Sequence, residues 1–141
     1  MIVLGLDVGT KRIGVAISDP SESFALPLAV MERTNLRDDV KRIAGLAREH
    51  QAGELAVGDP LRLSGERGPA SESVDRFIAA LEKQFEGKIH RVDERLTTAQ
   101  ATRTLVDADV SRAKRKQIVD KIAATLILET FLSRRRGAQS K

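Results

Sequence analysis

The stretch LGLDVGTKRIGVAISD, residues 4–19, decides the start of the fold. It joins two apolar runs, residues 2–8 and 12–18, through a turn that contains Gly9, which is typical of two antiparallel strands. Asp7 lies inside the first run. An ionised carboxylate in a strand meant for a core is costly unless cations or hydrogen-bond donors meet it. Asp7 is therefore the first candidate for a functional residue.

The neighbours of Asp7 in the strand are small. Side chains alternate between the two faces of a strand, so Gly5, Asp7 and Gly9 share one face. We interpret the two glycines as leaving space in front of the carboxylate. The alternative is a buried aspartate that caps the adjacent turn.

Helices and strands alternate along the rest of the chain. The expected elements are a strand at 24–31 that Pro27 places at a sheet edge, a helix capped by Asn35, a strand at 54–58, a helix marked by Val74, Phe77, Ile78, Leu81 and Phe85, a strand at 89–93, a helix opening at 97–100 and a last helix at 117–132. This order predicts an α/β fold with a five-stranded mixed sheet flanked by helices.

Composition indicates one globular domain, predicted at residues 1–134, followed by a basic tail at 135–141. The 141 residues include no cysteine, which excludes a disulfide framework and a thiolate zinc site. No apolar run approaches the roughly 20 residues of a membrane span, and no targeting segment opens the chain. We therefore expect a cytoplasmic protein that does not contact membranes. The net charge of +4 permits a nucleic-acid partner.

Two further acids are in unusual places. Asp120 shares a helical face with Ala123, Ala124 and Ile127, although an aspartate near a helix N-terminus can also simply stabilise the helix dipole. Glu94 follows the predicted strand 89–93, and the carboxyl ends of strands are where α/β proteins usually place their sites. The alternative for Glu94 is a solvated turn acid.

Together these positions suggest that Asp7, Glu94 and Asp120 converge at one site. Oxygen-only ligands suit Mg²⁺ or Mn²⁺. Such ions activate water and stabilise a leaving oxygen during phosphodiester cleavage. The sequence therefore favours a metal-dependent hydrolase.

Four segments, LDVGTKRIGVAISD, VGDPLRLSGERGP, DERLTTAQA and VDKIAATLILETFL, resemble the YqgF/RuvX family over about residues 2–132. The resemblance implies a ribonuclease H-like fold and nuclease activity, with Asp7, Glu94 and Asp120 as the family's acidic residues. Members are described as Holliday junction resolvases and as nucleases that mature the 5′ end of 16S ribosomal RNA. We expect the ribosomal RNA activity. A Holliday junction resolvase and a non-catalytic ribosome-assembly factor are the alternatives.

Asp59 departs from the family pattern, because this position is usually apolar in such proteins. Asp59 is thus an additional candidate metal ligand. The alternative is a solvent-facing loop acid before Pro60.

Several basic residues flank the acids and are candidates for binding substrate phosphates. Gly65 and Gly68 lie in a loop that could cradle a phosphate, although a plain surface turn is the alternative. Aromatic residues make up only 3% of the chain, so we expect recognition of backbone and shape rather than base sequence. The candidate substrate-binding residues are Lys11, Arg12, Arg62, Arg67, Arg95, Lys114, Arg115 and Lys116.

The expected partner is structured RNA or branched DNA, including ribosomal precursor particles. The protein is expected to be a monomer or a homodimer, since a junction resolvase needs two symmetric active sites. The first motif also resembles the phosphate motif of the actin and hexokinase ATPases. That superfamily encloses its nucleotide between two such domains, and 141 residues supply only one.

Overall fold

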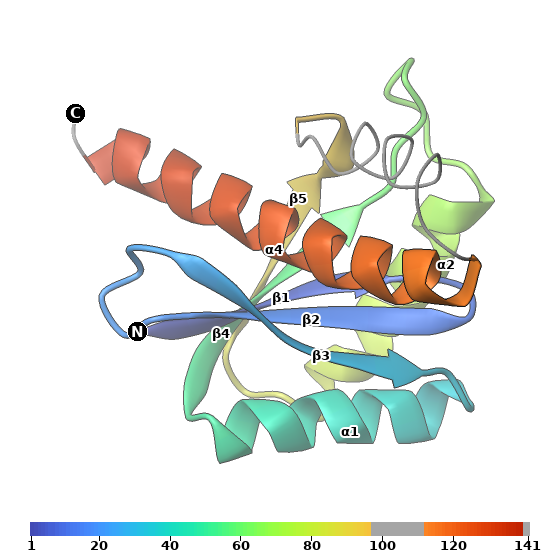
Figure 1. Cartoon of the computed structure of the whole chain (residues 1–141), viewed down its shortest axis with the longest axis horizontal. Coiled ribbons are helices and arrows are strands. Elements are labelled where there is room, and N and C mark those ends of the chain that lie inside the picture. The colour runs from blue at the N-terminus through green and yellow to red at the C-terminus, as the bar shows by residue number, and fades with distance from the viewer. Residues whose placement is uncertain (97–111, 140–141) are drawn as a thin grey trace.

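The computed structural model describes residues 1–96 and 112–139, and among them the side chains of 1–95 and 122–138. A five-stranded sheet forms the middle layer (Figure 1). One long helix crosses one face of the sheet, and two shorter helices cover the other face. The α/β prediction is confirmed.

The strands run in the order β3-β2-β1-β4-β5. The first three form an antiparallel meander, as predicted, and β3 is an edge strand. Strand β4 pairs parallel with β1, and β5 pairs parallel with β4. The strands are β1 (Ile2–Val8), β2 (Arg12–Ser18), β3 (Ala25–Glu32), β4 (Ala52–Asp59) and β5 (Lys88–Asp93).

The described helices are α1 (Leu36–Glu49), α2 (Pro69–Glu82), the short 3₁₀ turn η1 (Glu94–Leu96) and α4 (Arg112–Gln139). Asn35 caps α1 as predicted, because its side chain accepts the Asp38 N–H at 2.9 Å. Proline at the first position opens α2, where no backbone N–H is needed. The helix expected to open at 97–100 lies outside the described residues.

Two apolar cores hold the layers together. Leu4, Leu6 and Val57 of the sheet pack with α1 and α2 in the larger core. Ala124, Ile127 and Leu128 of α4 pack with smaller sheet residues in the second core. Glycine and alanine are frequent on this second face of the sheet, so α4 approaches it closely. The sheet residues of the second core are Val3, Ala16, Ala25, Ala56 and Val92.

Helix α4 has 28 residues and is longer than the predicted helix at 117–132. Its C-terminal half includes Arg135, whose guanidinium pairs with Glu22 at 2.7 Å and with Glu54. The same group lies 4.5 Å from the centre of the Phe131 ring. These contacts hold the last turns on the sheet, and the boundary predicted between residues 134 and 135 falls inside the helix. Among the described residues, no helix is long and apolar enough to cross a membrane.

Candidate active site

Strand β1 presents Asp7 on the face of the sheet that α4 covers. Val3 packs in the α4 core and Gly5 contacts α4, so alternation places Asp7 on that side. The residue is 8% exposed. A Cβ on Gly5 would lie 2.7 Å from Cβ of Leu128, so α4 already fills the space beside this glycine. The prediction that Gly5 leaves room in front of Asp7 is therefore wrong: this glycine admits the helix.

Gly9 has a different role. Its N–H donates to the carbonyl of Arg12 at 2.9 Å, and a Cβ on Gly9 would lie 2.8 Å from that carbonyl oxygen. Gly9 therefore closes the tight turn between β1 and β2. The turn holds Lys11 and Arg12 within a few residues of Asp7, and Lys11 is exposed.

Glu94 lies on the same face as Asp7. It is the first residue after β5, and its Oε1 oxygen is buried. A Cβ on Gly58 of β4 would lie 3.2 Å from Cγ and 3.3 Å from Cδ of Glu94. The glycine thus leaves room for the carboxylate to fold over the end of β4. Because β4 lies between β1 and β5, Asp7 and Glu94 flank the same strand at the carboxyl edge of the sheet.

The backbone at Glu94 is fixed by its neighbours. Asp93 accepts the N–H of Arg95 at 2.9 Å and also binds the Arg95 guanidinium at 2.7 Å. The guanidinium hydrogen bond is the main reason that the pKa of Asp93 is lowered. This closed turn carries Glu94 from the strand into η1.

Helix α4 brings Asp120 towards this edge. Arg135 contacts Glu54 near the start of β4, whereas Ile127 would meet a Cβ on Gly58 at 2.5 Å near the end of β4. The helix therefore runs antiparallel to β4, and residue 120 lies two turns beyond Ile127 in the direction of the carboxyl edge. The side chain of Asp120 lies outside the described residues. Among the side chains that are described, no three histidine or acidic groups are arranged to hold a metal ion.

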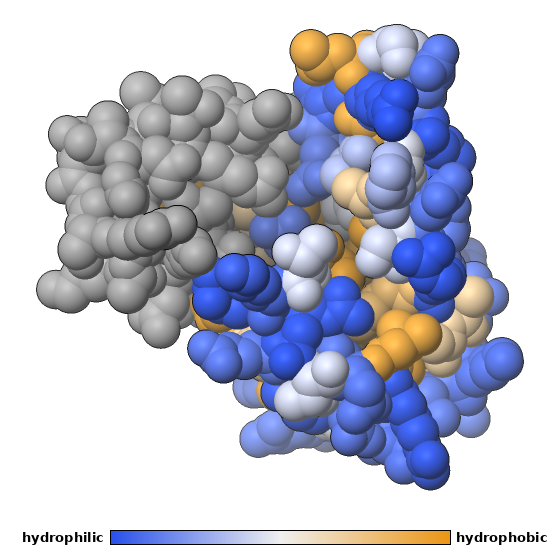
Figure 2. Space-filling model, turned by 90° about the vertical axis from the view of Figure 1, so that its right-hand side faces the viewer, coloured by the Kyte–Doolittle hydropathy of each residue, from blue (hydrophilic) through white to orange (hydrophobic). Residues whose placement is uncertain are grey.

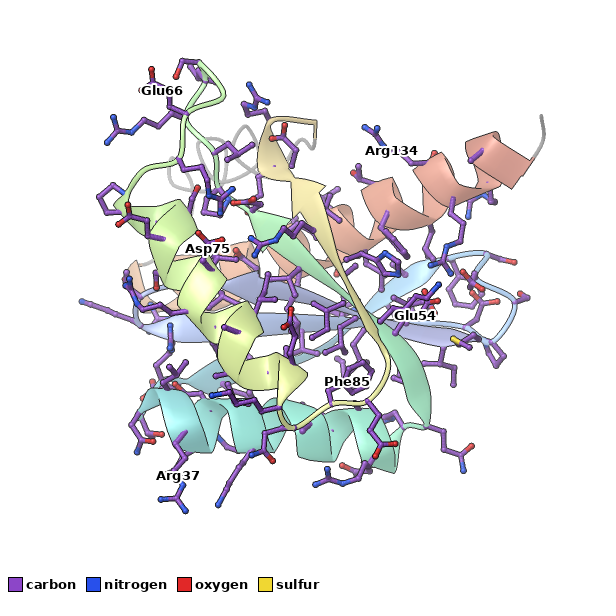
Figure 3. All side chains as sticks on the ribbon, turned by 180° about the vertical axis from the view of Figure 1, so that it is seen from behind. Arg37, Glu54, Glu66, Asp75, Phe85 and Arg134 are labelled. Atoms are coloured by element: carbon purple, nitrogen blue, oxygen red, sulfur yellow. The ribbon has the colours of Figure 1, made fainter. Side chains whose placement is uncertain are left out.

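Asp59 points to the opposite face of the sheet. Its carboxylate is 6% exposed and accepts a hydrogen bond from Arg67 at 2.9 Å, with Arg91 at 3.8 Å. Arg67 also binds Asp75, which lies on α2 beside the carboxyl ends of β4 and β5 (Figure 3). The hydrogen bond to Asp59 is the main cause of the raised pKa of Arg67. Asp59 is not the solvent-facing acid of the alternative, and the structure does not bring it to Asp7 and Glu94. Its role as a ligand stays a prediction.

The loop after β4 is closed on itself. The N–H groups of Arg62 and Gly65 donate to carbonyls of the same loop at 3.0 and 2.8 Å. Gly65 has a φ of +92°, a conformation that favours glycine. The guanidinium of Arg62 lies against Gly68. These contacts are those of a surface turn. The N–H groups of Arg62 and Gly65, which a phosphate cradle would use, point into the loop.

Arg95 ties this loop to the end of β5, because its Nη1 donates to the carbonyl of Leu63 at 3.2 Å. Figure 1 shows the loop and the end of β5 side by side. Both arginines are also paired with carboxylates of the protein, Arg67 with Asp59 and Arg95 with Asp93. Residues 114–116 belong to α4, and the side chains of Lys114, Arg115 and Lys116 lie outside the described residues.

One contact at the turn after Asp7 could not be predicted from the sequence. Arg33, which follows β3, donates from Nη1 to the carbonyl of Gly9 at 3.0 Å. No motif joins these two residues, which are 24 positions apart in the chain. A lone arginine after a strand gives no signal in the sequence pattern.

The chain matches the family described as "RuvX: Holliday junction resolvase" over residues 1–134. A relative from Clostridium tetani named "Putative pre-16S rRNA nuclease" is 46% identical over 132 residues, which cover 94% of this chain and 96% of the relative. A protein of the same name from Moorella thermoacetica is 44% identical over 134 residues, 95% of this chain and 96% of the relative.

Solved structures share the fold. RuvC from T. thermophilus in complex with a Holliday junction substrate has a TM-score of 0.57 at 15% identity, and the match covers 97% of this chain and 96% of that chain. The fowlpox virus Holliday junction resolvase has a TM-score of 0.54 at 17% identity, over 94% and 99% of the two chains. These neighbours confirm the ribonuclease H-like fold. With nearly its whole length matched by the family and by relatives of similar length, the chain belongs to the RuvX family.

Proposed function

We propose that this protein is a divalent-metal-dependent nuclease that hydrolyses phosphodiester bonds at the 5′ end of pre-16S ribosomal RNA. The observation that carries the proposal is the placement of Asp7 and Glu94 on one face of the sheet, on either side of Gly58. The choice of RNA substrate rests on relatives named for that activity, which are 40–46% identical to this chain. The proposal places the protein in the cytoplasm, where ribosomal RNA precursors are processed in bacteria.

The residues fit a hard divalent cation. Asp7 is nearly buried, the Oε1 oxygen of Glu94 is shielded from solvent, and Gly58 keeps a side chain out of the space that Glu94 occupies. Buried carboxylate oxygens on one face are the donor type that Mg²⁺ and Mn²⁺ prefer. We assign Asp7, Glu94 and Asp120 as the ligands. A bound ion would activate water and stabilise the leaving oxygen.

The protein supplies rigidity and orientation. Asp7 is held in a strand that pairs on both sides, and Glu94 is held by the Asp93–Arg95 turn. Helix α4 excludes water from the inner side of the site, since Ile127 packs against Gly58. We assign Lys11, which is exposed on the turn after Asp7, to contact a substrate phosphate. The end of the molecule that carries this turn is mostly hydrophilic outside the part drawn in grey (Figure 2), which suits a phosphate backbone.

A cleavage assay with purified protein tests the proposal. A pre-16S rRNA 5′ end, an unrelated single-stranded RNA and a four-way DNA junction are compared in Mg²⁺, in Mn²⁺ and in chelator. We expect metal-dependent cleavage of the ribosomal precursor, and none by the Asp7→Asn variant. Binding without cleavage in either metal would instead support a non-catalytic ribosome-assembly factor.

A Holliday junction resolvase is the second candidate, because the family that matches this chain is described by that activity. Symmetric cleavage of a junction requires two active sites related by a two-fold axis. Preferred cleavage of the DNA junction, together with a dimer in sedimentation equilibrium, would favour this activity. A strict monomer would favour the ribosomal RNA substrate.

A further inference from the structure

The turn between β1 and β2 is braced by a residue from outside the hairpin. Arg33 donates from its backbone N–H to the carbonyl of Lys11 at 2.8 Å and from Nη1 to the carbonyl of Gly9 at 3.0 Å. Arg33 thus holds Gly9 and Lys11, two residues of the turn that follows Asp7. Its guanidinium carbon also lies 5.5 Å from the centre of the Phe77 ring on α2.

Arg33 is in turn anchored by Asp39 of α1. Nε of Arg33 donates to Oδ2 of Asp39 at 2.9 Å, and the Asp39 side chain is fully buried. The other oxygen, Oδ1, accepts from the N–H of Thr34 at 3.0 Å and from its hydroxyl at 3.1 Å. Burial alone would disfavour the charged carboxylate, but these hydrogen bonds outweigh it and lower the pKa of Asp39 to about 2. The anchor is therefore charged at neutral pH.

The charged guanidinium of Arg33 is bonded to groups of the protein itself. Its side chain is 18% exposed, and its donors are directed to Asp39 and to Gly9. It is thus poorly placed to bind a substrate phosphate itself. What it can do is fix the backbone of the turn, since a planar guanidinium bonded at two edges leaves little freedom to either partner.

We propose that Arg33, anchored by Asp39, is a positioning residue that holds the β1–β2 turn, and through it Asp7 and Lys11, in the geometry needed for phosphodiester cleavage. The effect on cleavage rests on the proposed nuclease function, whereas the effect on the turn does not. Outer residues that orient metal ligands typically contribute about 10- to 100-fold to activity or metal affinity.

The chain offers a matched control. Arg42 of α1 also pairs with Asp39, at 2.6 Å, so it shares the same anchor. Its other contact is the carbonyl of Glu32 at 2.7 Å, at the end of β3, and not the turn. Replacing either arginine by methionine removes one ion pair to Asp39 and keeps an unbranched side chain. Only the change at Arg33 removes a bond to the turn.

The first measurement uses the metal-free protein and needs no activity. Amide hydrogen exchange at Gly9 reports the order of the turn, because its N–H is bonded to the carbonyl of Arg12. We expect exchange at Gly9 to be about 10-fold faster or more in Arg33→Met, and unchanged in Arg42→Met. Equal exchange rates at Gly9 in the two variants would overturn the proposal.

The second measurement is steady-state cleavage at saturating Mg²⁺. Arg33→Met should lower kcat by about 10- to 100-fold, as expected when a metal ligand is displaced, while Arg42→Met should keep both kcat and KM. A purely structural role would lower the melting temperature of both variants, and kcat of the folded fraction would be the same in Arg33→Met as in Arg42→Met. That result would overturn the proposal.

If Arg33→Met does not fold, Arg33→Lys replaces it. A lysine keeps the charge but has a single ammonium, so it cannot join Asp39 and the Gly9 carbonyl with the planar fork of arginine. The same faster exchange at Gly9 is then expected, and wild-type exchange would overturn the proposal. Should the wild-type protein cleave no substrate, the proposed function fails, and the exchange comparison still decides the role of Arg33.

Discussion

Gly5 of β1 and Leu128 of α4 are in such close contact that a Cβ on the glycine would lie 2.7 Å from Cβ of the leucine. The carbonyl oxygen of Ala124 would lie 3.0 Å away. Neither neighbour is the flexible end of a side chain, so α4 itself would have to move. The glycine thus sets the distance between the sheet and the helix that carries Asp120.

Gly5→Ala should therefore destabilise the protein. We expect a loss of about 1–3 kcal/mol in the free energy of unfolding, the usual range when a methyl group is forced into a packed core. Urea denaturation gives the value. Gly137→Ala is the matched control. Gly137 lies in α4, the helix that contacts Gly5, and a Cβ there meets nothing within 4 Å. This substitution should change the free energy of unfolding little, because Gly137 lies in the last turn of α4, where helix propensity counts for less than in the middle. Equal effects at the two glycines would mean that the contact with Leu128 is unimportant.

Asp7→Asn should abolish cleavage and leave substrate affinity in chelator nearly unchanged. Asparagine keeps the shape of the side chain but lacks the negative charge that a hard cation needs. Gel-shift binding in chelator and cleavage in Mg²⁺ separate the two effects. Asp38→Asn on the exposed side of α1 is the control and should behave as wild type. Wild-type cleavage by Asp7→Asn at saturating Mg²⁺ would exclude Asp7 as a ligand.

Asp120→Asn should stabilise the metal-free protein. Three carboxylates that converge raise one another's pKa and oppose folding. Removing one charge at nearly constant volume should gain on the order of 1–2 kcal/mol, about the equivalent of a shift of one pKa unit. Mg²⁺ should raise the melting temperature of the wild type more than that of the variant. Thermal melts in chelator and in Mg²⁺ test this. A lower melting temperature in chelator would make Asp120 a structural acid of the helix.

The basic cluster at the start of α4 should supply affinity without sequence preference. Replacing Lys114, Arg115 and Lys116 by alanine should weaken every nucleic acid alike. The slope of log affinity against log salt should become shallower by about 0.7–0.9 for each phosphate that the variant no longer neutralises. Arg37 and Lys41 are exposed on α1, on the far side of the sheet, and Figure 3 shows Arg37 pointing outward. Their double alanine variant is the control. Weaker binding of only one base sequence would contradict the prediction.

Asp39 should make stability depend on pH in the acid range. Its pKa is about 2 in the folded protein and 3.8 as its ordinary value, so the folded state favours the charged form. The stabilisation is complete above about pH 4 and disappears as the pH falls towards 2, and it amounts to about 2 kcal/mol. Asp19 also has a pKa lowered to about 2, chiefly by the Ser21 hydroxyl, so wild-type unfolding alone cannot isolate Asp39. The difference between wild type and Asp39→Asn, measured from pH 2 to 5, should shrink as the pH falls. A constant difference would contradict the prediction.

Much of the fold follows from local sequence patterns. The strands at 2–8 and 12–18 and the cap at Asn35 were predictable because alternation and capping involve neighbouring residues. The length of α4 was not, since its last turns are held by Arg135 through Glu22 and Glu54, which are distant in sequence. A run of arginines has the composition of a tail, whereas in the structure Arg135 pairs with Glu22 and Glu54 and Arg136 donates to the carbonyl of Glu22.

The candidate site was likewise predictable from the sequence only in part. Asp7 and Glu94 could be recognised from the sequence because a charged carboxylate is costly to bury at either position. Asp7 lies inside an apolar strand, and Glu94 lies directly after the end of one. The partners of Asp59 and the brace at Arg33 were not recognisable, since each joins side chains that only the folded sheet brings together. Alternation within β4 could have shown that Gly58 and Asp59 face opposite sides. It could not have shown that Arg67 lies on the second side.

The sheet order has a consequence for how the candidate site assembles. Strand β4 follows the meander of β1, β2 and β3 in the chain, yet it pairs with β1, and β5 pairs in turn with β4. Asp7 lies on the first strand, whereas Glu94 follows the last strand and residue 120 lies on α4. The candidate site therefore depends on contacts between distant parts of the chain, and it is complete only when β4, β5 and α4 have all joined the meander.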